Sequence, residues 1–174
     1  MTAQLHTPPV AAGTWTVSDS RTRVGFRVSN VGRPVRGSVA CRWGEVTVDD
    51  GGNPLRARAE LDLDSLDTGI RKRDSDLRAP RLLDIDRHPV MTWSADRFTR
   101  DDEGGWTAHG ELTVRGVTAP LAVIGTPEPD GGFLRVRASA VLDRTTVGIR
   151  VPRIVIGRVV AIEIDAWLTP SARP

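Results

Sequence analysis

The sequence predicts an all-β protein made of antiparallel strands, and the first reason is a period of two in its apolar residues. Residues 57–64 alternate apolar and charged side chains without interruption, and the pattern returns at 24–28, 35–41 and 134–142. Successive side chains of a strand point to opposite faces, so each segment has one apolar and one polar face. Such strands must close their apolar faces on one another, as a sandwich or a barrel.

The second reason is the short, regular spacing of the predicted strands. The connections at residues 49–54, 101–104 and 127–132 are rich in Gly, Asp and Pro, which favour tight turns. This spacing favours an antiparallel meander over parallel βαβ units. Gly37 and Gly44 indicate bends of the kind that curl a sheet into a barrel. We expect strands near residues 14–17, 23–29, 35–48, 56–64, 90–98, 105–115, 117–125, 132–143 and 159–168.

One segment breaks the alternation. Residues 67–78 carry few apolar side chains and lose the period of two. Asp67 or Thr68 can cap a helix, and Pro80 limits its far end. We therefore expect one short helical insertion at about residues 69–79 that lies over an end of the sheet.

The length of the chain suits a single domain. A chain of 174 residues buries roughly two-thirds of its unfolded surface, which is enough for a core without covalent staples. Its strands and one insertion form, in the simplest arrangement, an antiparallel up-and-down barrel of eight strands. The interior of such a barrel holds packed side chains or one small ligand. We expect a flexible tail at residues 1–12 and one barrel domain at residues 13–170.

Composition bears on the cellular setting of the protein. Cys41 is the only cysteine, so no intramolecular disulfide forms, and its strand phase predicts a small buried core residue. No run of eighteen apolar residues predicts a membrane helix, so membrane insertion is not expected. Residues 1–12 lack the basic and apolar regions of a secretory signal. These features predict a cytoplasmic protein.

The charged residues and histidines exclude several function classes. The formal net charge is +2, but the arginines alternate with acidic residues and form no basic block with aromatics, so a nucleic-acid partner is not expected. His6, His88 and His109 are scattered and have no metal-ligand spacing. No glycine-rich phosphate loop is present. The sequence therefore predicts no catalytic residues, no metal and no cofactor.

Several motifs occur in a fixed order along most of the chain, from Trp15 to Leu168. They are Ser65-Leu66-Asp67-Thr68-Gly69, Arg73-Asp74, Leu77-Arg78, Asp84, His88-Pro89, the G-E-L-T-V-R-G-V-T stretch at residues 110–118 with Pro120, and Leu142-Asp143-Arg144 with Gly148. In this order they resemble the signature of YceI-like proteins. The resemblance implies an extended lipocalin-like barrel whose apolar tunnel holds a long isoprenoid chain or a similar amphiphile. It thus implies a hydrophobic small-molecule partner and non-enzymatic binding, transport or storage. Where the family often carries two aromatics, this chain has Leu82 and Leu83, at a position expected to border the tunnel mouth.

Strand phase, read together with the resemblance, predicts the residues that line such a tunnel. Small residues interrupt the large ones, which would leave volume in the lumen. The alternative is that these side chains pack against one another and fill the barrel. The predicted ligand-binding residues are Phe26, Val28, Val39, Ala57, Ala59, Leu61, Leu63, Leu82, Leu83, Met91, Trp93, Leu112, Val136, Ala138, Ala140 and Ile162.

Other interpretations stay open at this point. The arginines of the insertion suit either a solvated helix face, which we favour, or a phosphate clamp at the tunnel mouth. Arg73-Asp74 and Asp143-Arg144 are expected to form structural ion pairs. A hydrolase or isomerase could use His88 or His109 on a lipid in the same cavity. A stress-related structural protein would have a filled core, and a homodimer is also open.

Overall fold

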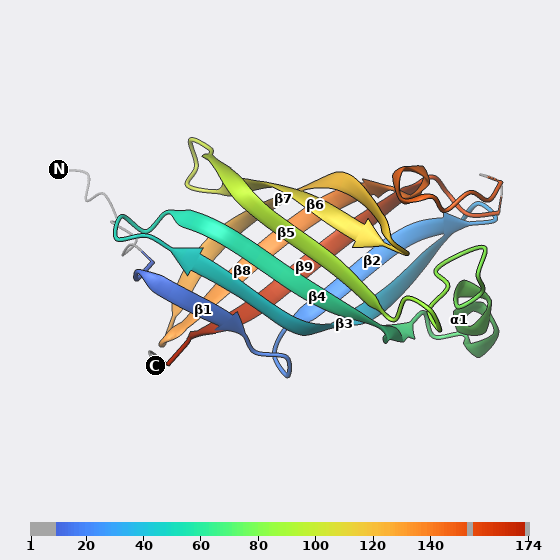
Figure 1. Ribbon diagram of the computed structural model, residues 1–174, viewed down its shortest axis with the longest axis horizontal. Coiled ribbons are helices and arrows are strands. Elements are labelled where there is room, and N and C mark those ends of the chain that lie inside the picture. Colours follow the sequence, from blue (N-terminus) through green and yellow to red (C-terminus); the bar gives the residue numbers. More distant parts are fainter. Residues whose placement is uncertain (1–9, 153–154, 173–174) are drawn as a thin grey trace.

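The computed structural model describes residues 10–152 and 155–172 and is an all-β barrel with one α-helix (Figure 1). A single 3-10 turn, Arg144–Val147, follows β8. The helix α1 spans Arg71–Leu77. The strands are β1 (Gly13–Val17), β2 (Arg23–Asn30), β3 (Arg33–Val48), β4 (Pro54–Asp67), β5 (Val90–Arg100), β6 (Trp106–Val114), β7 (Val117–Asp130), β8 (Phe133–Asp143) and β9 (Val159–Pro170).

The nine strands form a closed barrel with eight strand positions, because β1 and β2 share one position between β3 and β9. Strand β1 pairs with the end of β3, with Trp15 opposite Val46, and β2 pairs with its beginning, with Val24 opposite Val39. Both also pair with β9, and β3 pairs with β4 to close the barrel. Every pairing is antiparallel. The prediction of an eight-stranded antiparallel barrel with one helical insertion is confirmed.

The two ends of the barrel differ. Both termini of the described chain lie at one end, and α1 lies at the other (Figure 1). We call the whole β4–β5 connection, residues 68–89, the insertion. At the α1 end, side chains from the insertion and from the strand ends pack into a continuous core. Leu63, Ile85, Val114 and Val147 are each at most 1% exposed there. We call this the closed end.

Arg144 holds the β8–β9 connection over the closed end. Its side chain is 3% exposed. It donates to the backbone carbonyls of Gly157, Ile149, Val151 and Ile156 at 2.6–2.9 Å. One guanidinium therefore satisfies four carbonyls of a connection that has no strand partner for them.

Helix α1 is shorter than the predicted residues 69–79. Gly69 has a φ of +81° and interrupts the helical backbone before α1 begins. Asp74 accepts a hydrogen bond from the Thr68 N–H at 3.0 Å and another from the Thr68 hydroxyl. Thr68 thus donates to a residue inside the helix instead of capping it, and the cap position falls to Ile70, which makes no side-chain cap.

Strand β7 is longer than predicted and contains two prolines of the expected turn. Pro127 lies opposite Val136, and Pro129 lies opposite Leu134 on β8. The pairing of β7 with β6 ends at Gly125, so this part of β7 has a neighbouring strand on one side only. A proline lacks an N–H and is tolerated where the strand forms no second ladder.

The two expected ion pairs between sequence neighbours are wrong. Arg73 donates to the hydroxyl and carbonyl oxygens of Thr68, each at 2.8 Å. Asp143 accepts from Arg158 at 2.7 Å, whereas Arg144 bonds to the carbonyls named above. Arg73 and Asp74 are successive residues of α1, and Arg144 begins the 3-10 turn directly after Asp143. Adjacent side chains on such backbone do not face each other, so each charge finds another partner.

One barrel accounts for all nine strands described, and the expected bounds of the domain, residues 13–170, stay a prediction. Residues 1–9 of the expected tail lie outside the described residues. Among the residues that the structure describes, no helix is long and apolar enough to span a membrane.

Candidate functional site

A cavity of about 240 Å³ lies inside the barrel, between the closed end and the end that carries the termini. Every strand contributes to its lining, as does Val10 in front of β1. The cavity exists because inward positions alternate large and small side chains. Ala57, Ala59, Ala138 and Gly125 leave space between the larger residues.

The lining is almost entirely apolar. Among the lining residues, only Thr22, Glu45 and Arg58 carry polar or charged side chains. The Thr22 hydroxyl accepts a hydrogen bond from the backbone N–H of Trp167 at 3.0 Å, so this hydroxyl already has a partner. The arrangement suits an uncharged hydrocarbon chain and offers little for polar recognition.

The cavity reaches the end of the barrel opposite α1. Gly52 and Pro54 at the β3–β4 turn, Trp106 at the start of β6 and Pro127 near the β7–β8 turn line it there. Each of these residues is at least partly exposed. We call this the open end, and its three hairpin turns surround the mouth.

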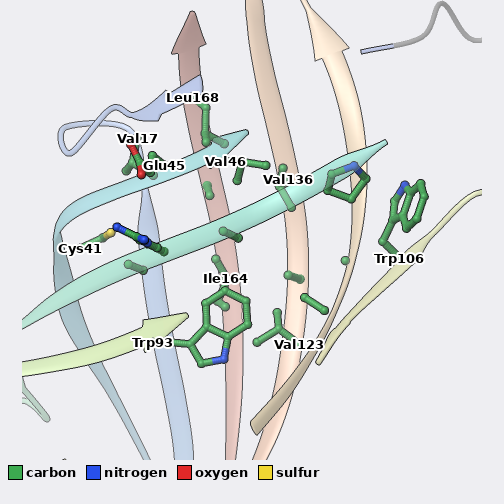
Figure 2. Close-up of a pocket in the computed structure, with 18 of the residues that line it drawn as sticks. Val17, Cys41, Glu45, Val46, Trp93, Trp106, Val123, Val136, Ile164 and Leu168 are labelled. Carbon is green, nitrogen blue, oxygen red and sulfur yellow. The ribbon is translucent and has the colours of Figure 1, made fainter. Parts of the chain in front are cut away.

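Trp93 on β5 is a large side chain at the inner part of the cavity (Figure 2). Its indole N–H donates to the Leu121 carbonyl on β7 at 3.0 Å. The ring crosses β6 over Gly110, where a Cβ atom would lie 2.5 Å from the indole Cε2. Gly110 therefore provides the space in which the indole lies against the wall.

Cys41 lines the cavity at a break in the barrel wall. Strand β2 pairs with β3 up to Val39, and β1 takes over only at Glu45, so residues 40–44 of β3 face the 18–22 turn. The Cys41 thiol is 7% exposed and donates to the Trp43 carbonyl. Burial raises the pKa of the Cys41 thiol, so it stays protonated near neutral pH. The prediction of a small buried core residue is confirmed.

The structure brings ten of the sixteen predicted site residues together around the cavity. They come from β4, β5, β6, β8 and β9. Their role in binding stays a prediction. These residues are Ala57, Ala59, Leu61, Met91, Trp93, Leu112, Val136, Ala138, Ala140 and Ile162.

The other six lie outside the cavity, toward the closed end. Val39, Leu63 and Leu83 belong to the packed core, and Leu82 is buried in the insertion. Phe26 and Val28 are half-buried on β2. The place expected for Leu82 and Leu83, beside the tunnel mouth, is wrong, because the insertion covers the closed end. Strand phase indicates which face a side chain occupies, but not how far along the barrel the cavity extends.

Sequence reasoning also missed several lining residues. Leu121 and Val123 alternate on β7 and could have been found from phase. Val46 and Val48 could not, since β3 has a bulge between Cys41 and Trp43 that moves the inward face from odd to even positions. The remaining missed positions include Phe98, Trp106, Ala108, Leu134, Ala166 and Leu168.

Neither His88 nor His109 lines the cavity. His109 points outward and its Nε2 lies 3.0 Å from the Thr99 hydroxyl. His88 follows the insertion at the closed end, and His6 lies outside the described residues. Within residues 10–152 and 155–172, no three His, Cys, Asp or Glu side chains gather as metal ligands. In the described part of the lining, the Cys41 thiol donates to the Trp43 carbonyl, and no hydrogen bond joins it to Glu45 or to another base.

The chain resembles known proteins over nearly its whole length. The family model described as YceI-like domain matches residues 15–168. A UPF0312 protein of Yersinia enterocolitica is 29% identical over 103 residues, covering 58% of this chain and 53% of that protein. A UPF0312 protein of Pectobacterium carotovorum is 30% identical over 101 residues, covering 56% and 52%. The alignments thus span about half the length of these curated relatives.

Solved structures share the fold at low sequence identity. BcnA of Burkholderia cenocepacia superposes with a TM-score of 0.77 at 15% identity, covering 87% of this chain and 98% of that one. A polyisoprenoid binding domain from Saccharophagus degradans, implicated in plant cell wall breakdown, gives a TM-score of 0.66 at 11% identity, covering 90% and 98%. The fold is therefore common to these proteins.

Proposed function

The chain belongs to the YceI-like domain family, and from this premise we propose that it binds the apolar chain of an isoprenoid or similar amphiphile without chemically changing it. The observation that carries the proposal is the nearly all-apolar cavity inside the barrel. A related fold is described as a polyisoprenoid binding domain, which supports the same class of ligand here.

The size of the cavity suits one chain rather than a bulky ligand. Its volume of about 240 Å³ lies just below the roughly 300–1,000 Å³ typical of small-molecule sites. Each buried methylene contributes about 0.8 kcal/mol, so a hydrocarbon chain binds without strong polar contacts. The polar end of the ligand would remain at the open end, where the hairpin turns meet solvent.

The lining also favours a carrier over an enzyme. Cys41 is its one thiol, and the thiol is held protonated by burial. Neither His88 nor His109 lines the cavity. A ligand held there would be shielded from water and released unchanged, as transport or storage requires.

The proposal is tested by extracting lipid from natively expressed protein and identifying it by mass spectrometry. We expect a stoichiometric amphiphile with a long apolar chain. Ala138→Trp fills the lumen and should lose most of this lipid, while the outward-facing Ser139→Trp on the same strand should keep it. Folding of both variants is checked by circular dichroism.

Absence of lipid from the wild-type protein, together with no binding of added farnesol, would overturn the proposal and favour a structural role. Conversion of the bound lipid to a product during incubation would restore the enzyme hypothesis. If Ala138→Trp alone fails to fold, Ala59→Trp on β4 tests the same lumen from the opposite wall.

A further inference from the structure

Trp93 lies at the boundary between the cavity and the packed core. Its side chain lines the cavity and also packs against the core cluster of the closed end. On the flanking strands, Ala59 and Leu112 are its register partners. Toward the closed end, Leu61 and Met91 are the last residues of β4 and β5 that line the cavity, and beyond them Leu63 and Val114 belong to the core. The indole therefore lies near the inner end of the open volume, one register pair before the last lining residues of β4 and β5.

Two contacts fix the position of this ring. The indole N–H donates to the Leu121 carbonyl at 3.0 Å, which ties the far edge of the ring to β7. At Gly110, a Cβ atom would lie 2.5 Å from Cε2 and 2.6 Å from Cζ2 of the indole. Real Cβ atoms do not approach so closely, so any side chain at position 110 must push the ring toward the lumen.

We propose that Trp93, seated on Gly110, sets how deeply an apolar chain enters the cavity and so determines the chain length that the protein selects. This inference rests on the proposed function, because it concerns a chain bound in the same cavity. A chain that meets the indole has only the space beside Leu61 and Met91 left beyond it, so further units stay in solvent at the open end. Affinity then stops rising with length at the chain that reaches Trp93.

The test measures binding of geraniol, farnesol, geranylgeraniol and solanesol by displacement of Nile red. For wild type, affinity should rise along the series and then level off. We call the alcohol at which affinity stops rising the limit. Trp93→Ala removes the barrier, so the limit should move to a longer alcohol. Each further buried methylene corresponds to about a fourfold gain in affinity, so a gain of at least tenfold is expected for the first alcohol beyond the wild-type limit. Gly110→Ala should move the limit to a shorter alcohol.

Matched variants elsewhere in the barrel separate this effect from general loosening. Trp43→Ala removes a tryptophan that does not line the cavity. Gly25→Ala adds a methyl group to a strand glycine whose nearest neighbour would be a carbonyl at 3.7 Å. Both should keep the wild-type limit.

The outcomes are distinct. An unchanged limit in both Trp93→Ala and Gly110→Ala overturns the inference, and so does an equal shift in the two controls. If Trp93→Ala does not fold, Trp93→Phe replaces it. A longer limit in Trp93→Phe with a shorter limit in Gly110→Ala then supports the inference, and an unchanged limit in both overturns it. Absence of binding by wild type to every alcohol would overturn the proposed function itself.

Discussion

The guanidinium of Arg21 stacks on the indole of Trp167, with 3.8 Å between the guanidinium carbon and the ring centroid. The same guanidinium lies 4.3 Å from the centroid of Phe133, whose ring meets Trp167 edge-on. Arg21 belongs to the 18–22 turn between β1 and β2. Thr22 and Ser18 also bond to the backbone of Trp167. This cluster holds the turn over the break in the wall beside Cys41.

Arg21→Ala should loosen that turn and expose Cys41 to solvent. Cation–π contacts of this kind contribute about 1–2 kcal/mol in total. A change of that size corresponds to roughly a five- to thirtyfold increase in the population of the open turn. The rate of bromobimane labelling at Cys41, the only thiol in the chain, reports the opening. Arg27→Ala on β2, an exposed arginine, serves as the control and should label like wild type. An equal rate in Arg21→Ala and wild type would show that the cluster does not hold the turn.

Ligand bound in the cavity should protect Cys41. Because burial raises the pKa of this thiol, labelling of the free protein should be slow at neutral pH and faster as pH rises and thiolate forms. Saturating farnesol should slow labelling further at every pH, since the thiol lines the cavity. The measurement is the second-order labelling rate across pH with and without farnesol. An unchanged labelling rate in the presence of saturating farnesol would mean that farnesol binds outside the cavity.

The charge around the mouth should disfavour phosphorylated ligands. The turns at residues 49–53, 101–105 and 128–132 carry acidic residues and no Lys or Arg, while the arginines of the insertion lie at the closed end. Farnesyl phosphate should therefore bind more weakly than farnesol, by about tenfold at low salt, with the gap shrinking as salt screens the charges. Calorimetric titration of both ligands at two salt concentrations measures this gap.

A variant that neutralises part of this rim provides the control. Asp50→Asn with Asp102→Asn and Asp130→Asn removes three negative charges while leaving the turn-capping Asp49 and Asp101 in place. The preference for farnesol should narrow in this variant. If wild type binds farnesyl phosphate more tightly than farnesol, the result would instead support a phosphate clamp at the mouth.

Arg144 should be essential for the closed end. Arg144→Lys keeps the charge but cannot reach four carbonyls in different directions, so several buried acceptors lose their donor. We expect a loss of at least about 3 kcal/mol in the free energy of unfolding, measured by urea denaturation. Arg137→Lys on β8, an exposed arginine, should change it by less than about 0.5 kcal/mol. Similar losses in the two variants would contradict this role.

The fold could be predicted from the sequence because the alternation of apolar and polar residues along a strand is a local property. The residues from Ala57 to Leu63 show an inward face that follows directly from the geometry of a strand. Turn residues at the hairpins then limited how the strands could connect. The helical insertion was also recognisable, although its first residue depended on the contact between Asp74 and Thr68.

The candidate site was recoverable only in part, because depth along the barrel is not a local property. Ala59 and Leu63 share one face of β4, yet the first lines the cavity and the second is packed in the core. The bulge between Cys41 and Trp43 reversed the phase for Val46 and Val48. The difference in depth leaves no mark in the spacing of the residues, and the bulge shows only as a shift of the apolar residues from odd to even positions beside Gly44.

The sequence by itself determined that the strands have apolar inner faces, that they connect antiparallel, and that one short insertion interrupts them. Tertiary structure alone decided which end of the barrel is filled, since Ile85 and Leu83 of the insertion plug the end where we expected a mouth. It also decided where the indole of Trp93 lies, because the ring crosses β6 at Gly110 and donates to the Leu121 carbonyl on β7. The physical reason is that side-chain alternation is set by neighbouring residues, whereas empty volume depends on every strand around the barrel at once.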